Sequence, residues 1–143
     1  MVAITVTPAS VSLVSGDTQK GIAGEAITVG MMVYYNDIDG RWWKAKGNGN
    51  AAEAGASNVG MAYSTALAAG QQLSVILPGA IVNMGAGGIT AGANYYLSGS
   101  TAGGFGLEAD VPTTGMRKTH CAMGVGVNQL MLTRVYNGGS VLP

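Results

Sequence analysis

Closely spaced turn signals are the feature that most restricts the fold of this chain. Short β-branched and aromatic runs alternate with Gly, Asn, Asp or Pro about every 8–12 residues, which is typical of an all-β sandwich or barrel. Only residues 50–58 and 63–72 have a helix-favouring composition, and Gly55 and Gly70 interrupt them. We therefore expect strands near Ile4–Thr7, Val11–Val14, Met31–Tyr35, Arg41–Lys46, Val59–Tyr63, Gln72–Leu77, Ala80–Met84, Ala93–Leu97, Gly104–Glu108, His120–Val127 and Gln129–Tyr136.

One stretch of the sequence occurs twice and predicts an internal duplication. The matching pieces are two Ile-Thr-x-Gly turns, two Tyr pairs and two short Gly-containing strands. They are Ile27–Gly30 with Ile89–Gly92, Tyr34–Tyr35 with Tyr95–Tyr96, and Val59–Ala62 with Met123–Gly126. Glycine at the end of each turn can adopt the positive φ that such turns require. We expect a single compact β-domain over residues 21–143, built from two related units at about 24–84 and 86–136.

Residues 1–20 lie outside the duplicated units, and two interpretations of them stay open. The alternation of apolar residues and the presence of Pro8 suit an edge strand or an extended arm. An arm would bind a neighbouring protein through Ile4, Val6, Val11 and Leu13, and its deletion (residues 2–15) would barely change the melting temperature. In the other interpretation, Ile4–Thr7 closes the protein's own barrel.

The aromatic cluster of the first unit surrounds a predicted hairpin. Asp39-Gly40 is a strong signal for a two-residue type I′ turn. A calcium loop beginning at Asp37 is the weaker alternative, because the third carboxylate and the distal Glu are missing. Alternation along Arg41–Lys46 places Trp43 in the core and Trp42 on a partly open face. Trp42 and Tyr34 are therefore candidate interface residues.

No catalytic constellation is recognisable. His120 and Cys121 are the only residues of their types, and neighbours in a strand point to opposite faces, so they are not expected to form a nucleophile–base pair. We expect no enzymatic activity, no cofactor and no metal. Arg117 and Lys118, next to His120, form the only local positive patch. This patch is either a solvated strand end or a contact for an acidic protein surface.

The charge balance argues against nucleic acid and for self-association. Seven basic and seven acidic residues give zero formal net charge, and only 10 % of residues are charged. No run of about 18 apolar residues suggests a membrane span, and the N-terminus lacks the features of a signal peptide. We expect a protein made in the cytoplasm that works as a homo-oligomer.

Several of these pieces together resemble the capsid decoration (cement) proteins of tailed bacteriophages and related domains of phage head fibres. The shared sequence motifs cover roughly residues 21–136. It lies at Gly24–Tyr34, Asp39–Ala45, Gly60–Ala62, Ala69–Val75, Ile89–Ser98 and Met123–Gly126. The chain departs from the pattern in an extra Gln at 71–72 and in Gly126, where Ala is usual. Neither departure affects a site, because the family has no catalytic motif.

The resemblance implies a compact, β-tulip-like barrel that binds the outside of an assembled capsid and stabilises it. The implied partners are the major capsid protein and two further copies in a homotrimer, and the implied location is the exterior of the virion. Two rival functions stay open. A head- or tail-fibre module would bind host-surface glycans through Trp42, Tyr34 or Tyr95. A bacterial cell-surface β-domain is the other, although it would need a signal peptide.

Overall fold

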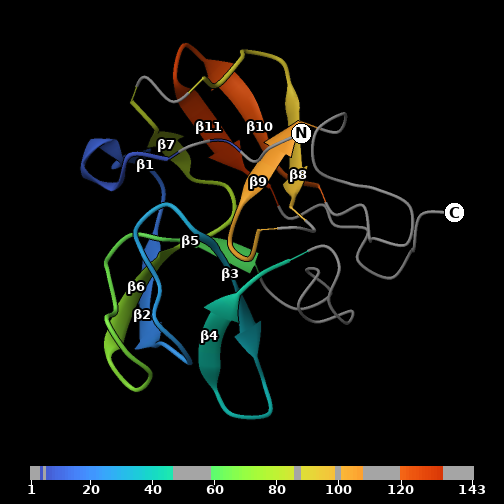
Figure 1. Cartoon of the computed structure of the whole chain (residues 1–143). Coiled ribbons are helices and arrows are strands. Elements are labelled where there is room, and N and C mark those ends of the chain that lie inside the picture. Colours follow the sequence, from blue (N-terminus) through green and yellow to red (C-terminus); the bar gives the residue numbers. More distant parts are fainter. Residues whose placement is uncertain are drawn as a thin grey trace, which may run out of the picture.

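The structure is a computed structural model that describes residues 4, 6–46, 59–85, 88–98, 101–107 and 120–133. Its strands form two antiparallel sheets that pack together, sheet A above sheet B in Figure 1. Sheet A contains, in spatial order, β1 (Ser12–Ser15), β7 (Ile81–Asn83), β11 (Gln129–Leu132), β10 (His120–Gly126), β8 (Asn94–Leu97) and β9 (Phe105–Leu107). Sheet B contains β2 (Thr18–Ile22), β6 (Gln72–Ile76), β5 (Val59–Ala62), β3 (Met32–Asn36) and β4 (Arg41–Lys44). The predicted all-β fold is confirmed as a two-sheet sandwich and not a closed barrel.

Most predicted strands are present, and the differences lie near the N-terminus. Residues 18–22 were expected to carry no strand, but they form β2 along the edge of β6, from Thr18 opposite Ile76 to Ile22 opposite Gln72. The described part of the expected strand Ile4–Thr7 is not a strand, and a 3-10 turn, η1, follows at Pro8–Ser10. Residues 63–71, whose helix-favouring composition Gly70 interrupts, form turns and an isolated bridge. Residues 50–58 lie outside the described part of the chain.

The two sheets share one strand order. Reading from β2, sheet B runs β2-β6-β5-β3-β4, and from β7 sheet A runs β7-β11-β10-β8-β9, with β1 added at its edge. The two Ile-Thr-x-Gly turns make matching hydrogen bonds. Gly30 N donates to Ala62 O over 2.9 Å, and Gly92 N donates to Gly124 O over 2.8 Å, with φ of +90° and +83° at the two glycines. Each strand of sheet B therefore has a counterpart in sheet A.

These hydrogen bonds correct the alignment of the two copies by one or two residues. Val33 lies opposite Gly60, and Tyr95 lies opposite Ala122, so Tyr95 is the counterpart of Val33. The Tyr pairs are thus one position out of register, and Gly124 corresponds to Ala62 instead of Gly60. The backbone hydrogen bonds of the turns fix which residues of the two units correspond. The Tyr pairs and Gly-containing strands that suggested the sequence match need not occupy equivalent positions.

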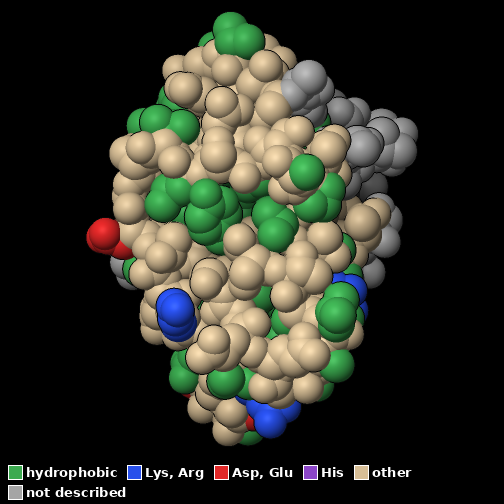
Figure 2. Space-filling view, turned by 90° about the vertical axis from the view of Figure 1, so that its left-hand side faces the viewer, with side chains coloured by type: hydrophobic (Ala, Val, Ile, Leu, Met, Phe, Trp, Pro, Cys, Tyr) green, Lys and Arg blue, Asp and Glu red, His purple; other side chains and the backbone are tan. Residues whose placement is uncertain are grey.

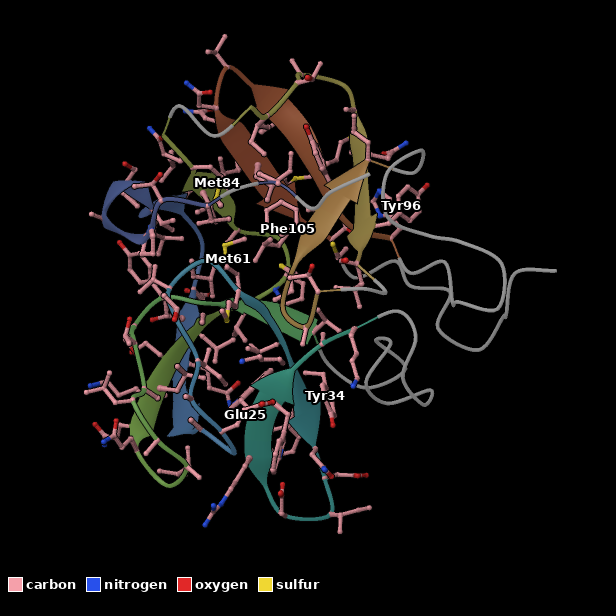
Figure 3. The ribbon with its side chains drawn as sticks, in the orientation of Figure 1. Glu25, Tyr34, Met61, Met84, Tyr96 and Phe105 are labelled. Carbon is pink, nitrogen blue, oxygen red and sulfur yellow. The ribbon has the colours of Figure 1, made fainter. Side chains whose placement is uncertain are left out.

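The main core lies between the sheets and joins two faces that are not equivalent. Figure 3 shows Met61, Met84 and Phe105 in this space. Sheet B contributes the face that carries Met32, Met61 and Ile76. Sheet A contributes its Tyr95 face, and Val33, the counterpart of Tyr95, points to the other side of sheet B. The two units therefore pack with unlike faces in contact, an arrangement that we call head-to-tail stacking.

A second, smaller cluster covers the far side of sheet B. It contains Ala23, Ile27, Val33, Trp42, Ala62, Ala66, Leu73 and Val75. Ile27 and Ala66 exchange two backbone hydrogen bonds of 2.9 Å and hold the covering segments together. In sheet A the corresponding β10–β11 connection is seven residues shorter, because Gly124 and Leu130 correspond to Ala62 and Val75. The Tyr95 face thus lacks this cover, and sheet B packs there instead.

Substitution of Gly124 by Ala is expected to destabilise the fold by about 3 kcal/mol, the upper part of the range for overpacking. A Cβ at Gly124 would overlap the backbone carbonyl of Thr90, which cannot move without breaking the adjacent turn. The control is Gly126→Ala in the same strand, where the nearest atom is the flexible Gln129 Oε1 at 3.2 Å. Equal unfolding free energies for the two variants in urea would contradict this account.

The β3–β4 hairpin differs from the predicted type I′ turn. Asn36 pairs with Arg41 around a four-residue loop, and Gly40 N donates to Asn36 O over 2.8 Å. Only Gly40 has a positive φ in this loop, at +69°. Asp39 instead accepts hydrogen bonds through both carboxylate oxygens, from Arg41 N and from Trp43 Nε1, each over 3.0 Å.

Gly40→Val should therefore cost about 1–3 kcal/mol, because a β-branched residue is strained at positive φ. Gly40→Asn should cost less, since Asn tolerates this conformation better. Chemical denaturation of both variants measures the difference. If Val and Asn are equally tolerated, the left-handed conformation at residue 40 is wrong.

Candidate functional site

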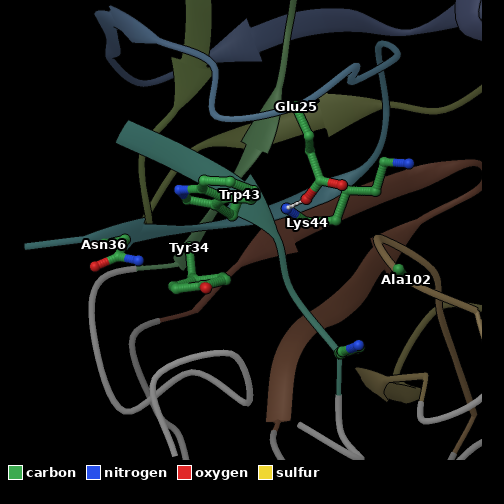
Figure 4. A pocket seen from close by; sticks show the side chains of 7 residues that line it. Glu25, Tyr34, Asn36, Trp43, Lys44 and Ala102 are labelled. Atoms are coloured by element: carbon green, nitrogen blue, oxygen red, sulfur yellow. Dashed lines mark hydrogen bonds between the residues drawn. The ribbon is translucent and has the colours of Figure 1, made fainter. Parts of the chain in front are cut away.

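A hollow lined by aromatic and polar side chains lies on sheet B beside the β3–β4 hairpin. It has a volume of about 370 Å³ and is lined by Glu25, Tyr34, Asn36, Trp43, Lys44, Lys46 and Ala102. Figure 4 shows Trp43 and Tyr34 from adjacent strands, with the Glu25 carboxylate to the right of the Trp43 ring. Glu25 Oε2 accepts a hydrogen bond of 3.0 Å from the backbone N of Lys44. We call this hollow the Trp43 pocket.

The Trp43 pocket has the groups of a binding site and not of a nucleophilic active site. Two aromatic rings could stack on an apolar ligand face, and a carboxylate, an amide and two ammonium groups could hydrogen-bond to its polar edge. The described residues of the lining include no Ser, Thr, Cys or His that could form a nucleophile–base pair. The pocket can therefore hold a small polar molecule with an apolar face.

The prediction for the two tryptophans is wrong and must be reversed. Trp42 is only 2 % exposed and contacts Tyr35 edge-to-face at 5.4 Å, whereas Trp43 is partly exposed. Alternation correctly separated the two side chains but could not tell which face was open. Both faces of sheet B are covered, one by sheet A and the other by the smaller cluster. Trp42 is thus unavailable as an interface residue.

The other predicted site residues are not brought together. Tyr34 lines the Trp43 pocket with 7 % exposure. Ile4, Val6, Val11 and Leu13 pack against the main core of the protein itself. Arg117 and Lys118 lie outside the described residues.

Cys121 and His120 occupy different surroundings. The thiol of Cys121 is buried beside the carbonyl oxygen of Tyr95, at 3.6 Å, and burial raises its pKa far above the usual range. The ring of His120 lies between Thr133 Oγ1, 2.9 Å from Nδ1, and Asn94 Oδ1, 3.1 Å from Nε2. Because an amide oxygen can only accept, Nε2 carries the proton. Partial burial lowers the pKa of His120.

The lowered pKa predicts a pH dependence of stability. The unfolded chain binds a proton to His120 near pH 6.5, before the folded chain does. Stability should therefore be full above about pH 6.5 and fall as the pH drops below it, until the folded protein is protonated as well. Urea unfolding between about pH 8 and pH 5 should show this loss, and His120→Gln should flatten it. An unchanged slope in the variant would assign the effect to other groups.

Among the described residues, charged side chains are distributed unevenly between the two sheets. All described Asp, Glu, Lys and Arg residues fall within residues 17–46, and they are Asp17, Lys20, Glu25, Asp37, Asp39, Arg41, Lys44 and Lys46. On the face of the molecule that Figure 2 shows, the charged side chains lie at mid-height and below, away from sheet A in the upper part. The described strands and turns of sheet A carry no charged side chain, although they expose Val14, Val125 and Val127. We call this part the uncharged end.

Among the described residues, no group of three or more His, Cys, Asp or Glu side chains is placed to hold a metal ion. In the same part of the chain, no helix has the length and apolar character to cross a membrane.

The fold and these surfaces define a class: a two-sheet antiparallel β-sandwich of two stacked units, with a polar aromatic pocket beside the β3–β4 hairpin and no charged side chain on the described strands of sheet A. No protein-family model, curated protein or solved structure matches the chain.

Proposed function

We propose that this chain is a structural protein of a tailed-phage virion, which binds the outside of an assembled capsid and stabilises it. The observation that carries the proposal is the uncharged end, whose exposed valines suit attachment to a large, neutral protein surface. The sequence resemblance over residues 21–136 supplies the class of partner, the major capsid protein. In this proposal the protein is made in the host cytoplasm, is no enzyme, needs no cofactor and contacts neither nucleic acid nor membrane.

Attachment is assigned to the uncharged end instead of to an N-terminal arm. Ile4, Val6, Val11 and Leu13 are occupied in the protein's own core, so they are not free to enter a groove of the capsid. Val127, in the β10–β11 turn, is 85 % exposed and lies at the top of the molecule in Figure 1. Ile38, in the β3–β4 loop at the bottom, is 92 % exposed. The two side chains form a matched pair for a test.

Co-sedimentation with empty, expanded capsids tests the proposal. The wild-type protein should pellet with capsids and raise their melting temperature. Val127→Asp should weaken binding, because it places a charge in a contact without a partner, whereas Ile38→Asp should not. Absence of wild-type binding to capsids contradicts the proposed function. Binding that is lost only with Ile38→Asp would move the attachment surface to the opposite end.

A second candidate function, a fibre module that binds host-surface glycans, is favoured by the Trp43 pocket. Sugars present an apolar face for stacking and hydroxyl groups for hydrogen bonds, which matches the two aromatic rings and the polar groups of the lining. Titration with host-surface oligosaccharides should then quench tryptophan fluorescence. Trp43→Ala should abolish binding, and Lys20→Ala, outside the pocket, should leave it unchanged. Without saturable quenching by any host glycan, this candidate fails.

A further inference from the structure

The outer face of sheet A carries a row of apolar side chains that is the counterpart of a buried row in sheet B. In sheet B, the paired residues Met32, Met61 and Ile76 form a row across three strands. The corresponding row in sheet A is Asn94, Met123 and Met131, and Ile81 extends it onto β7. The position of the methionine on the central strand, Met61 or Met123, is the same in both sheets.

The two rows differ in what covers them. Met32, Met61 and Ile76 are fully buried in the main core, where they pack against the other unit. Met123, Met131 and Ile81 are partly exposed and belong to neither hydrophobic cluster. Head-to-tail stacking explains this difference, because it joins unlike faces and leaves one face of each unit without a partner unit. Sheet B covers its open face with its own segments around Ile27 and Ala66.

We propose that the Met123–Met131–Ile81 face binds the same face of a second copy of this chain. A second copy fits because the face and the described strands around it carry no charge. Among the described residues, bringing two identical faces together therefore creates no like-charge pair, which is the usual obstacle to self-association through one surface. Methionine is flexible and adapts to an opposing apolar surface. The corresponding row in sheet B, which contains two methionines, already packs against the other unit in the main core.

The geometry of the contact sets the number of copies. A face that meets itself is isologous and closes about a twofold axis, so the product is a dimer. The homotrimer implied by the sequence resemblance would need two different faces per copy. This inference concerns the isolated protein in solution and does not depend on capsid binding.

The size of the face sets the expected strength. Six strands about 4.8 Å apart, with an average length of about 4 residues, give a footprint of roughly 400 Å². That is about half of the 800 Å² that each partner contributes to a standard interface. The dimer should therefore be weak, and its mass should depend on protein concentration.

Sedimentation equilibrium of the full chain from about 10 μM to about 1 mM tests the proposal, since these concentrations bracket a weak dimer. The mass should rise from 14.3 kDa towards twice that value. Met131→Lys should raise the dissociation constant at least about tenfold by placing two ammonium groups at the twofold contact. Gln72→Lys adds the same charge on an exposed position of sheet B and should leave the dimer intact.

If Met131→Lys does not fold, Asn94→Lys decides, because Asn94 is exposed at the end of the same row next to Met123. A monomer at every concentration overturns the proposal, and so does a trimer. A dimer that both lysine variants leave unchanged also overturns it, because the contact then lies elsewhere.

Discussion

Deletion of residues 2–15 is expected to lower the free energy of unfolding by about 5 kcal/mol or more, a large part of the 5–15 kcal/mol typical of a domain. The described residues of this segment belong to the body of the protein. Ile4 N donates to Phe105 O over 2.7 Å, Val11 is buried, and β1 pairs with β7. Ile4, Val6 and Leu13 pack on the core as well, and full burial of such a side chain contributes about 1.5–3 kcal/mol.

This expectation reverses the one that followed from an extended arm, namely that the deletion would barely change the melting temperature. Two point variants separate loss of packing from loss of chain. Leu13→Ala should destabilise the fold, whereas Val14→Ala, whose side chain is half exposed on the same strand, should have an effect near zero. Thermal unfolding measures all three proteins. If the truncated protein has the same melting temperature as the wild type, the interpretation of residues 1–20 as an extended arm would be correct after all.

Replacement of Trp42 by Ala should destabilise the fold by about 3–5 kcal/mol, the range for a buried tryptophan. Its ring fills the smaller cluster, contacts Tyr35 and lies against Gly21, where a Cβ would come within 2.6 Å of Trp42 Nε1. Most of the other buried residues of the smaller cluster are Ala and Val, which are too short to fill the volume that the ring leaves.

Trp43→Ala is the matched control and should cost about 1–2 kcal/mol, through lost packing and the lost hydrogen bond to Asp39. Denaturant midpoints of the two variants give the comparison directly. A larger loss for Trp43 than for Trp42 would show that the faces of β4 are assigned the wrong way round.

Local turn chemistry explains why so much of the fold was predictable. Gly30 and Gly92 end turns that only a positive φ allows, and the strands that follow them were placed within one or two residues. By contrast, β2 has the polar sequence Thr-Gln-Lys-Gly, and only its pairing with β6 makes it a strand. Its formation depends on a partner about 50 residues away, which local pattern cannot supply.

The site was less predictable because it depends on which faces are covered. Alternation separated Trp42 from Trp43, but covering segments far away in the sequence decide which of them is exposed. Tyr34 was identified as a candidate, and the structure places it in a pocket with Glu25, Asn36 and Lys46, which were not among the predicted site residues.

The separation of charge between the two ends has a consequence for how the solvent acts on this protein. Four acidic and four basic described side chains share one end, so dissolved ions screen contacts made there. The described residues of the uncharged end contribute no Coulomb term that ions could screen, and salts that are excluded from protein surfaces strengthen apolar burial. Raising the ionic strength should therefore weaken binding through the charged end around sheet B. Binding through the uncharged end should stay unchanged or become stronger.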